Sequence, residues 1–395
     1  MTRLWLLAIA FALFSFSAAR SHSADRISIL DSGTPVDRSG NEDASIALAN
    51  AVKTANLSTA KGQPACVYIP AGIYRIVTPP PAFVRAGCIV GDGPPQSTLL
   101  VDPKMSGDLF TWAEAWVVTT PGPTVVGIRV RGSAGATQIQ NAFVFYDRND
   151  QVFMDNVEVI GLHGRALYSG VSKNSPTAYI RESHFRSLRF FEDGAPGIPT
   201  VEFSSQGNAG SDATNEIRLS QVDIYGSRGP SLVIRNNGGG SVRDIIIEAL
   251  RVEGTENGTV QADLVTIGDP SMKGNVNNVA LTDVELIDPY KGFAALRLTA
   301  PNGQAAPYQI GVSGFIGGGI PLGQGLRIDA GRTSSFHLTG VHTLDTNIVI
   351  GPGVSGVLLD GGGQEEGWTY KIDATSTNGI IFPVYRTGSS VGTRH

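Results

Sequence analysis

The sequence has few charged side chains, few histidines and only two cysteines. Charged residues make up 16% of the 395-residue chain, and 30 Lys+Arg against 35 Asp+Glu give a net charge of −5. Nucleic-acid binding requires clustered positive charge, so this composition gives no reason to expect a nucleic-acid partner. Hydrophobic residues still make up 41% of the chain, which is enough for a sizeable core and argues against general disorder.

Long apolar runs are absent outside the first residues. Met1 to Arg3 and the apolar run from Leu4 to Phe16 have the positive start and short apolar core of a secretory signal, with candidate cleavage ends near residues 19 and 24. The alternative is a membrane anchor, which needs about 20 apolar residues. We expect residues 1–24 to be a signal peptide. The mature protein is then secreted or periplasmic, with no membrane association after cleavage.

Cys66 and Cys88 are the two cysteines. An exported protein can form a disulfide between them, and two reduced, buried thiols are the alternative. Neither cysteine has a nearby histidine that would suggest a nucleophile or a metal ligand. We therefore predict no metal at either position.

Glycine, in contrast, is abundant, with 49 residues. Glycine destabilises helices because it loses much backbone entropy on ordering, so this composition favours short strands and tight turns over a helical bundle.

A short apolar pattern recurs along the chain after residue 120. One apolar residue is usually followed, three and five positions later, by two more. The matches start at Met154, Ile180, Leu219, Ile247, Leu281, Ile310 and Leu338. The interval of about 26 to 39 residues lies within the range of solenoids and propellers. Propeller blades have about four strands each, and the two or three strand-like runs per repeat seen here favour the coils of a parallel β-helix.

Residues 43–60 differ from the repeats and predict an amphipathic helix, with apolar residues at Ile46, Leu48, Ala49, Val52 and Ala55. The exposed end of a solenoid needs a cover, so we expect this helix to be the N-terminal cap. The coils are predicted to fill residues 25–363. Residues 364–395 lose the repeat and are expected to form a tail that packs on the coils or extends from them.

The N-terminal part of the chain resembles a known superfamily. The resemblance is carried, in order, by an Asp/Gly-rich turn at residues 31–43, the helix, Val67-Tyr-Ile-Pro-Ala-Gly-Ile-Tyr74, Val90-Gly-Asp-Gly93 and Thr98-Leu-Leu100. Together, residues 27–101 resemble the first module of the pectate-lyase-like superfamily, in the subgroup with rhamnogalacturonase-like, epimerase-like and tailspike-like proteins. The resemblance implies an all-β, single-stranded, right-handed parallel β-helix with an N-terminal capping α-helix. It also implies that strand spacing of about 4.8 Å would bring Cys66 and Cys88 within disulfide reach if they share a position in successive coils.

The resemblance leaves the reaction open, because this fold carries lyases, hydrolases, epimerases and binding proteins. The motifs of polygalacturonase-like hydrolases are absent as such. The Asp-Pro-His-Asp motif of epimerases keeps only its first two residues, in Asp288-Pro-Tyr-Lys291.

Charged and aromatic side chains are expected at outward positions of the middle coils. Our alignment of the repeats places them in three rows: Glu158, His184, Asp223, Arg251 and Glu285; then Arg186, Tyr225 and Glu253; then Arg181 and Glu248. A solvated face with cross-strand ion pairs is the simplest interpretation.

The functional interpretation is an exported protein that binds an acidic polysaccharide and cleaves it by β-elimination. Arginines would hold the uronate carboxylates, and a histidine or tyrosine would move the proton. The catalytic candidates are His184, Arg186, Asp223, Tyr225 and Arg251, and the substrate-binding candidates are Glu158, Arg181, Glu248 and Glu253. One alternative is an inverting hydrolase that uses Glu158 and Asp223. Another is a polysaccharide-binding or structural surface protein without catalysis.

No cofactor is firmly predicted. Calcium can assist a lyase, and Asp147, Asn149, Asp150 and Asp155 form the best local group of oxygen ligands, although turns favour the same residue types. Beyond the polysaccharide, the sequence is compatible with a monomer or a homo-oligomer.

Overall fold

The computed structural model describes fifteen stretches of the chain: residues 25–84, 87–115, 122–172, 177–206, 213–238, 240–254, 261–268, 275–290, 292–299, 308–316, 324–329, 336–342, 347–351, 357–361 and 369–372. The predicted signal peptide, residues 1–24, and most of the predicted tail lie outside these residues.

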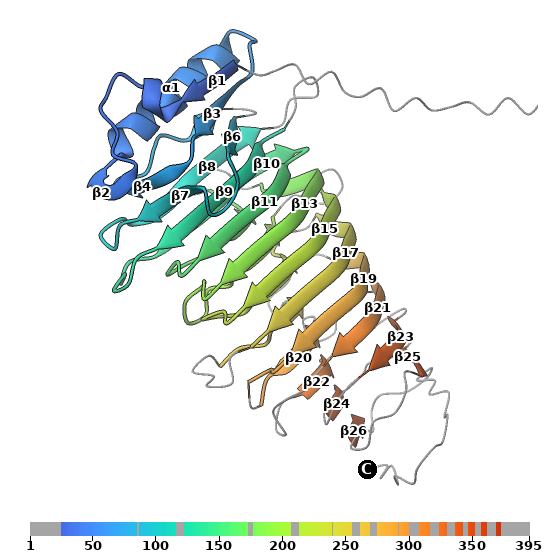
Figure 1. Cartoon of the computed structure of the whole chain (residues 1–395). Helices are drawn as coiled ribbons and strands as arrows, with labels where there is room; N and C mark the ends of the chain where they lie inside the picture. Colours follow the sequence, from blue (N-terminus) through green and yellow to red (C-terminus); the bar gives the residue numbers. More distant parts are fainter. Residues whose placement is uncertain are drawn as a thin grey trace, which may run out of the picture.

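All strands of the described residues belong to one parallel solenoid (Figure 1), so the predicted right-handed parallel β-helix is confirmed as the fold class. One ladder joins the long strands β9 (Thr124–Gly132), β11 (Phe153–Ile160), β13 (Tyr179–Phe191), β15 (Ala213–Tyr225), β17 (Ser241–Glu253), β19 (Asn275–Ile287), β21 (Tyr308–Ile316), β23 (Phe336–His342) and β25 (Val357–Gly361). A second ladder joins β8 (Gly107–Ala115), β10 (Gln140–Asp150), β12 (Leu167–Gly170), β14 (Val201–Ser205), β16 (Leu232–Asn236), β18 (Val265–Ile267), β20 (Ala294–Leu298), β22 (Gln324–Ile328), β24 (Asn347–Ile350) and β26 (Thr369–Ile372). The second ladder therefore continues past residue 363, where the sequence analysis ended the coils.

The first coils are built from shorter strands that precede both ladders. These are β1 (Asp25–Ser28), β2 (Ser39–Asp43), β3 (Ala65–Ile69), β4 (Gly72–Ile76), β5 (Phe83–Val84), β6 (Cys88–Gly91) and β7 (Ser97–Val101), with a 3-10 turn η1 at Ile29–Asp31. Strands β6 and β7 pair with successive parts of β9, and β5 pairs with β8. The N-terminal module thus continues directly into the repeating coils.

The long strands bend at corners that have the same position in each coil. Residues there adopt the left-handed backbone conformation, with φ between 49° and 70°. The first corner contains Gln151, Glu182, Glu216, Asp244 and Asn278; the second contains Gly127, Asn156, Ser187, Gln221, Ala249 and Asp283; the third contains Gly161, Glu192, Gly226 and Asp288. Non-glycine residues rarely adopt this conformation, so its repetition shows that coil stacking imposes it. Side-chain hydrogen bonds link neighbouring coils at the corners, as from Ser187 Oγ to Gln221 Oε1 at 3.2 Å.

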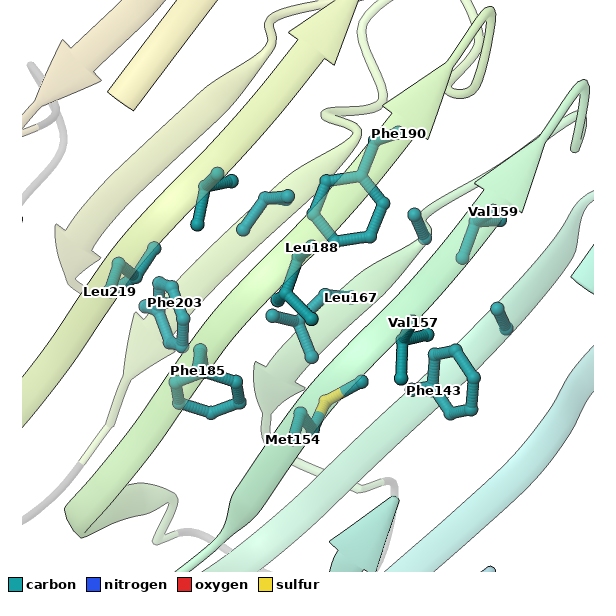
Figure 2. Packing of buried hydrophobic residues seen from close by; sticks show 14 of the residues in the cluster. Phe143, Met154, Val157, Val159, Leu167, Phe185, Leu188, Phe190, Phe203 and Leu219 are labelled. Carbon is teal, nitrogen blue, oxygen red and sulfur yellow. The ribbon is translucent and has the colours of Figure 1, made fainter. Parts of the chain in front are cut away.

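The core fills the inside of the coils with stacked apolar rows (Figure 2). Met154, Phe185 and Leu219 occupy one register position, and Val157 and Leu188 occupy another. Each of these side chains is at most 1% exposed. Alternation along each strand therefore places the intervening polar residues on the outer surface, as the period-2 pattern requires.

Helix α1 (Ser45–Ala60) covers the N-terminal end of the solenoid, as predicted (Figure 1). It packs on β1, β3, β5 and η1 through Leu48, Ala51, Val52 and Ala55. Ile46, which we had expected on this face, is 64% exposed. Within the described residues, no helix is both long enough and apolar enough to span a membrane.

The predicted disulfide between Cys66 and Cys88 is present. The two cysteines are direct partners in the β3–β6 pairing, with Cα atoms 4.5 Å apart. The bond therefore links two adjacent coils of the N-terminal module.

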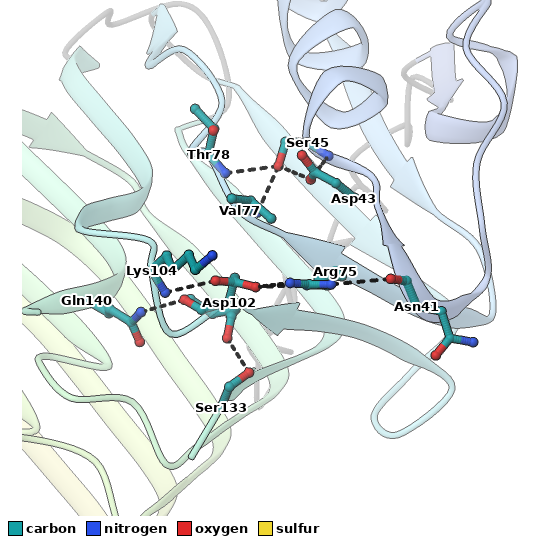
Figure 3. Close-up of polar contacts among 11 residues, drawn as sticks. Asn41, Asp43, Ser45, Arg75, Val77, Thr78, Asp102, Lys104, Ser133 and Gln140 are labelled. Atoms are coloured by element: carbon teal, nitrogen blue, oxygen red, sulfur yellow. Dashed lines mark hydrogen bonds and ion pairs between the residues drawn. The ribbon is translucent and has the colours of Figure 1, made fainter. Parts of the chain in front are cut away.

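An ion pair between Arg75 and the buried carboxylate of Asp102 connects the capped end to the following coil (Figure 3). Asp102 is only 2% exposed; its Oδ2 accepts a hydrogen bond from Arg75 Nε at 2.8 Å, and its Oδ1 accepts one from the Lys104 amide at 2.8 Å. Burial alone would raise the pKa of Asp102, but these two donors hold it below its usual value. Arg75 also donates to the Asn41 carbonyl, just before the cap helix. The pair thus links three segments of the N-terminal module.

We predict that Arg75→Met destabilises the protein by about 1–3 kcal/mol, because the buried Asp102 carboxylate loses its cation while the aliphatic stem is kept. The matched control is Arg186→Met. It removes an arginine that pairs with Asp155 at 2.7 Å but is 55% exposed, so it should cost less than about 1 kcal/mol. The shift in urea denaturation midpoint measures both. Equal shifts for the two variants would contradict a special contribution from the Arg75–Asp102 pair.

Candidate functional site

A surface groove of about 550 Å³ crosses the coils that begin with β9 and end with β17. The groove is lined by residues of the second corner and by outward-facing residues between the second and third corners. Its lining includes Pro94, Pro95, Arg129, Glu158, Arg189 and Asp223. It is therefore the candidate functional site.

The charged residues of the groove form one register row, here called the charge row. Arg129 pairs with Glu158, Glu158 with Arg189, and Arg189 with Asp223, each in the next coil. The row continues beyond the groove to Arg251 and Glu285. Its charges alternate in sign from coil to coil, at steps of about 4.8 Å.

The two ends of the charge row are satisfied by ion pairs. At one end, Arg129 Nε lies 2.5 Å from Glu158 Oε2. At the other end, Arg251 lies 2.9 Å from Glu253 and 3.4 Å from Glu285. Within the described residues, the central Arg189 guanidinium and Asp223 carboxylate form neither an ion pair nor a side-chain hydrogen bond. The middle of the groove therefore presents a cation and an anion to a ligand.

Exposure along the charge row increases away from the cap. The Arg129 and Glu158 side chains are 23% and 11% exposed, whereas those of Arg251 and Glu285 are 52% and 49% exposed. Glu158 is nearly enclosed although it points outward between the core residues Val157 and Val159. The groove is thus deep at its cap end and shallow at the other.

Uncharged polar side chains accompany the charge row along the second corner. Asn156, Ser187 and Gln221 line the groove in successive coils. Their amide and hydroxyl groups can donate and accept hydrogen bonds, which suits the hydroxyls of a sugar chain.

The predicted site residues are only partly brought together. Glu158 and Asp223 line the groove, as the outward row predicted. Arg251 directly follows Asp223 in the charge row, and Tyr225 and Glu253 pair with each other in the flanking row. These three lie beside the groove and are not among its lining residues.

The register expected for His184, Arg186 and Arg181 was wrong. His184 pairs with Phe153 and Arg218, and Arg186 pairs with Asp155 and Ser220. Both lie before the second corner, on a neighbouring face of the coil. Arg186 shares its row with Glu248, while Arg181 lies before the first corner and pairs with Asp150 at 2.8 Å. The error arose because Ile180, Ser183 and Phe185 follow the same spacing as the true repeat Phe185, Leu188 and Phe190.

Arg189 and Arg129 were therefore missed, although the sequence carries a signal for both. Arg189 lies between Leu188 and Phe190 of the true repeat. Arg129 lies between Ile128 and Val130, which follow Val125 with the same apolar spacing. An alignment of the repeats that includes the earlier match at Val125, and that uses Phe185 in place of Ile180, places both arginines in the charge row.

The oxygen ligands proposed for calcium have different partners in the structure. Asp147 accepts hydrogen bonds from Ser172, Asp150 binds Arg181, and Asp155 binds Arg186. Across the described stretches, no group of three or more His, Cys, Asp or Glu side chains is arranged to hold a metal ion. The three carboxylates are therefore each engaged with a different partner.

Among the described residues, the carboxyl groups of Glu202 and Asp193 are fully buried and lie outside the groove. Glu202 is fully buried; Arg165 Nε donates to its Oε2 at 2.6 Å, and Arg235 binds its other oxygen. Asp193 is also fully buried; its Oδ1 accepts a hydrogen bond from the Leu162 amide at 2.7 Å, and its Oδ2 has no partner. Burial raises the pKa of Asp193 well above its usual value. A perturbed carboxyl can mark a functional site, but this one is closed to ligands and lies beside a corner, which indicates a structural role.

The fold and the groove define the class of protein: a capped right-handed parallel β-helix with a charged surface groove. No protein-family model matches the sequence, and no curated protein matches it.

Solved structures are similar to the chain at the level of the fold. The mannuronan C-5 epimerase AlgE6 A-module of Azotobacter vinelandii has a TM-score of 0.53 and 13% identity, over 90% of this chain and 96% of that one. The surface adhesin PfbA of Streptococcus pneumoniae has a TM-score of 0.54 and 11% identity, over 89% of each chain. ORF18 of Geobacillus virus E2 has a TM-score of 0.53 and 11% identity, over 89% of this chain but only 60% of its own length. Identities this low establish the shared fold alone.

We predict that Asp193→Asn removes part of the pH dependence of stability. The pKa of Asp193 is higher in the folded state than in the unfolded state, so the protonated carboxyl stabilises the fold fully below about pH 4. This stabilisation is lost as the pH rises towards the folded pKa. The free energy of unfolding of the wild type should therefore fall relative to that of Asp193→Asn between about pH 4 and 8, as measured by urea denaturation. The exposed corner variant Glu216→Gln should track the wild type. A constant difference between wild type and Asp193→Asn across this range would show that the carboxyl is not perturbed.

Proposed function

We propose that this protein binds a polysaccharide along the groove and hydrolyses it with inversion, using Glu158 and Asp223. The observation that carries the proposal is the placement of these two carboxylates in one groove, in the same register row and two coils apart. Two coils correspond to roughly 9–10 Å, at the upper end of the separation used by inverting glycosidases, which need room for a water between base and sugar.

The surroundings of the two carboxylates suggest different roles for them. Glu158 is held in place by its ion pair with Arg129, so its carboxylate suits the base that orients a water and takes its proton. Among the described residues the Asp223 carboxylate has no ion-pair or side-chain hydrogen-bond partner, so it is free to contact the oxygen of the leaving sugar and suits the acid. In this reaction the water oxygen bonds to the anomeric carbon. Its proton passes to Glu158, and the leaving sugar oxygen takes the proton of Asp223.

The fold of the chain supports a carbohydrate partner. The AlgE6 module is named as a mannuronan epimerase, so one protein with this architecture acts on a polysaccharide. The PfbA structure is named as a surface adhesin, and a protein that only binds is therefore the alternative without catalysis. The predicted signal peptide and the Cys66–Cys88 disulfide favour a secreted or periplasmic location.

A second candidate reaction is β-elimination on a uronic-acid chain, which the sequence first suggested. One observation favours it: in the part of the chain that the structure describes, the Arg189 guanidinium has no ion-pair partner, and it lies in the centre of the groove, where it could neutralise a uronate carboxylate. However, the residues first chosen to move the proton are not in the groove. His184 lies before the second corner, and Tyr225 lies in the flanking row.

We predict that Glu158→Gln and Asp223→Asn each reduce turnover by about 100-fold or more, because each removes one proton-transfer group. The assay incubates the protein with polygalacturonate, alginate, hyaluronan, dextran and β-glucan, and follows new reducing ends. The matched control, Glu285→Gln, removes a carboxylate of the same row outside the groove and should keep wild-type turnover.

Absorbance of an unsaturated sugar in the ultraviolet separates the two reactions. Reducing ends without this absorbance, with inverted anomers by NMR, support hydrolysis, whereas equal amounts of both products would establish elimination. Full activity of either Glu158→Gln or Asp223→Asn would reject the assigned roles. Binding without any product would leave a polysaccharide-binding protein.

A further inference from the structure

The groove is bounded at its cap end by the loop between β6 and β7. Pro94 and Pro95, in the middle of this loop, are lining residues of the groove. The loop belongs to the coil before β9, yet it extends across the next coil. An atom added at the Cβ position of Gly93 would lie 3.9 Å from Asn156 Nδ2, although Asn156 is in the coil of β11. The loop therefore overhangs the coil of Arg129.

Hydrogen bonds from two sides hold this loop in place. The Gly93 amide donates to the Gly127 carbonyl at 2.7 Å, and the Ser97 amide donates back to the Gly93 carbonyl at 2.9 Å. Thr98 Oγ1 donates to the Pro95 carbonyl at 2.8 Å.

Asp92, at the start of the loop, is fixed by strand β3 of the preceding coil and by the residue Ala71 after it. Its carboxylate accepts hydrogen bonds from Tyr68 Oη at 2.6 Å and from the Ala71 amide at 2.8 Å. A loop fixed on both sides, with two adjacent prolines that have restricted backbones, forms a rigid wall.

The exposure of the charge row agrees with a groove that is closed at this end. The side chains of Arg129 and Glu158, near the wall, are less than one quarter exposed, whereas those of Arg251 and Glu285, three and four coils beyond Glu158, are about half exposed. A polymer lying along the solenoid axis can extend freely only in the direction of β19. At the other end it meets the two prolines.

We propose that the groove binds the end of a polysaccharide chain and that the enzyme removes short fragments from that end. The proposal rests on the proposed hydrolysis at Glu158 and Asp223. The midpoint of these carboxylates lies in the coil of Arg189, one coil beyond Glu158. The one or two free coils between this point and the wall leave roughly 5–10 Å, enough for one or two sugar units. Monosaccharides or disaccharides are the expected products.

The first test uses the polymer that the wild type hydrolyses best in the panel above. Early in the reaction, mass spectrometry should find only mono- or disaccharides, while the viscosity of the polymer stays almost unchanged. Fragments of mixed length with a rapid loss of viscosity would overturn the end-binding proposal and leave the proposed hydrolysis intact. Absence of any cleavage would instead count against the proposed function.

The second test removes the wall. Pro94→Gly/Pro95→Gly deletes both rings from the groove and frees the backbone, so longer fragments should appear and viscosity should fall at least several-fold faster per bond cleaved. The matched control is Pro79→Gly/Pro80→Gly, in a run of three prolines that does not line the groove, and its products should match those of the wild type. Thermal unfolding checks that both variants are folded. An unchanged product pattern in the folded Pro94→Gly/Pro95→Gly variant would contradict the wall.

The third test measures binding without turnover. Glu158→Gln is titrated with an oligosaccharide of the same polymer, free or with a bulky streptavidin complex attached to one end or the other. Blocking one particular end should weaken binding by at least tenfold, while blocking the opposite end should have little effect. Equal binding of both blocked forms would show that the chain passes through the groove.

Discussion

The parallel, in-register stacking of the coils is the constraint on which the rest of the structure depends. Because each strand pairs with the same position of the next coil, one inward position produces an apolar stack such as Met154, Phe185 and Leu219. For the same reason, one outward position repeated in successive coils forms the charge row. It also explains why residues as different as Ser187, Gln221 and Ala249 share an unusual backbone conformation at the second corner. Surface chemistry in this fold is therefore organised in lines parallel to the solenoid axis.

The groove is formed by the charge row together with a loop of the N-terminal module. Alternating charges satisfy each other at both ends of the charge row and leave Arg189 and Asp223 open in the middle. The loop containing Pro94 and Pro95 adds depth at one end, and this asymmetry gives the groove a direction that the repeats alone lack. The Cys66–Cys88 disulfide and the Arg75–Asp102 pair hold together the coils next to this loop.

Much of the fold could be predicted from the sequence because its signals are local. Apolar spacing such as Leu219, Val222 and Ile224 specifies an inward strand face, and the module around Val67 to Tyr74 identifies the start of the solenoid. Glu158, Asp223 and Arg251 were assigned to the correct row for the same reason. His184 was not, because β13 is long enough to carry the apolar spacing twice, and only pairing with β11 decides which copy is in register. The wall of Pro94 and Pro95 depends on how a loop lies over another coil, which no local pattern encodes.

A crystal structure of Glu158→Gln with a bound oligosaccharide tests the central claim most directly. The account predicts a sugar chain parallel to the solenoid axis, in contact with Arg189 and Asp223, with one terminus against Pro94 and Pro95. A ligand on another face, such as the one that carries Tyr146 and Tyr168, or a chain crossing the groove without meeting the two prolines, would contradict it.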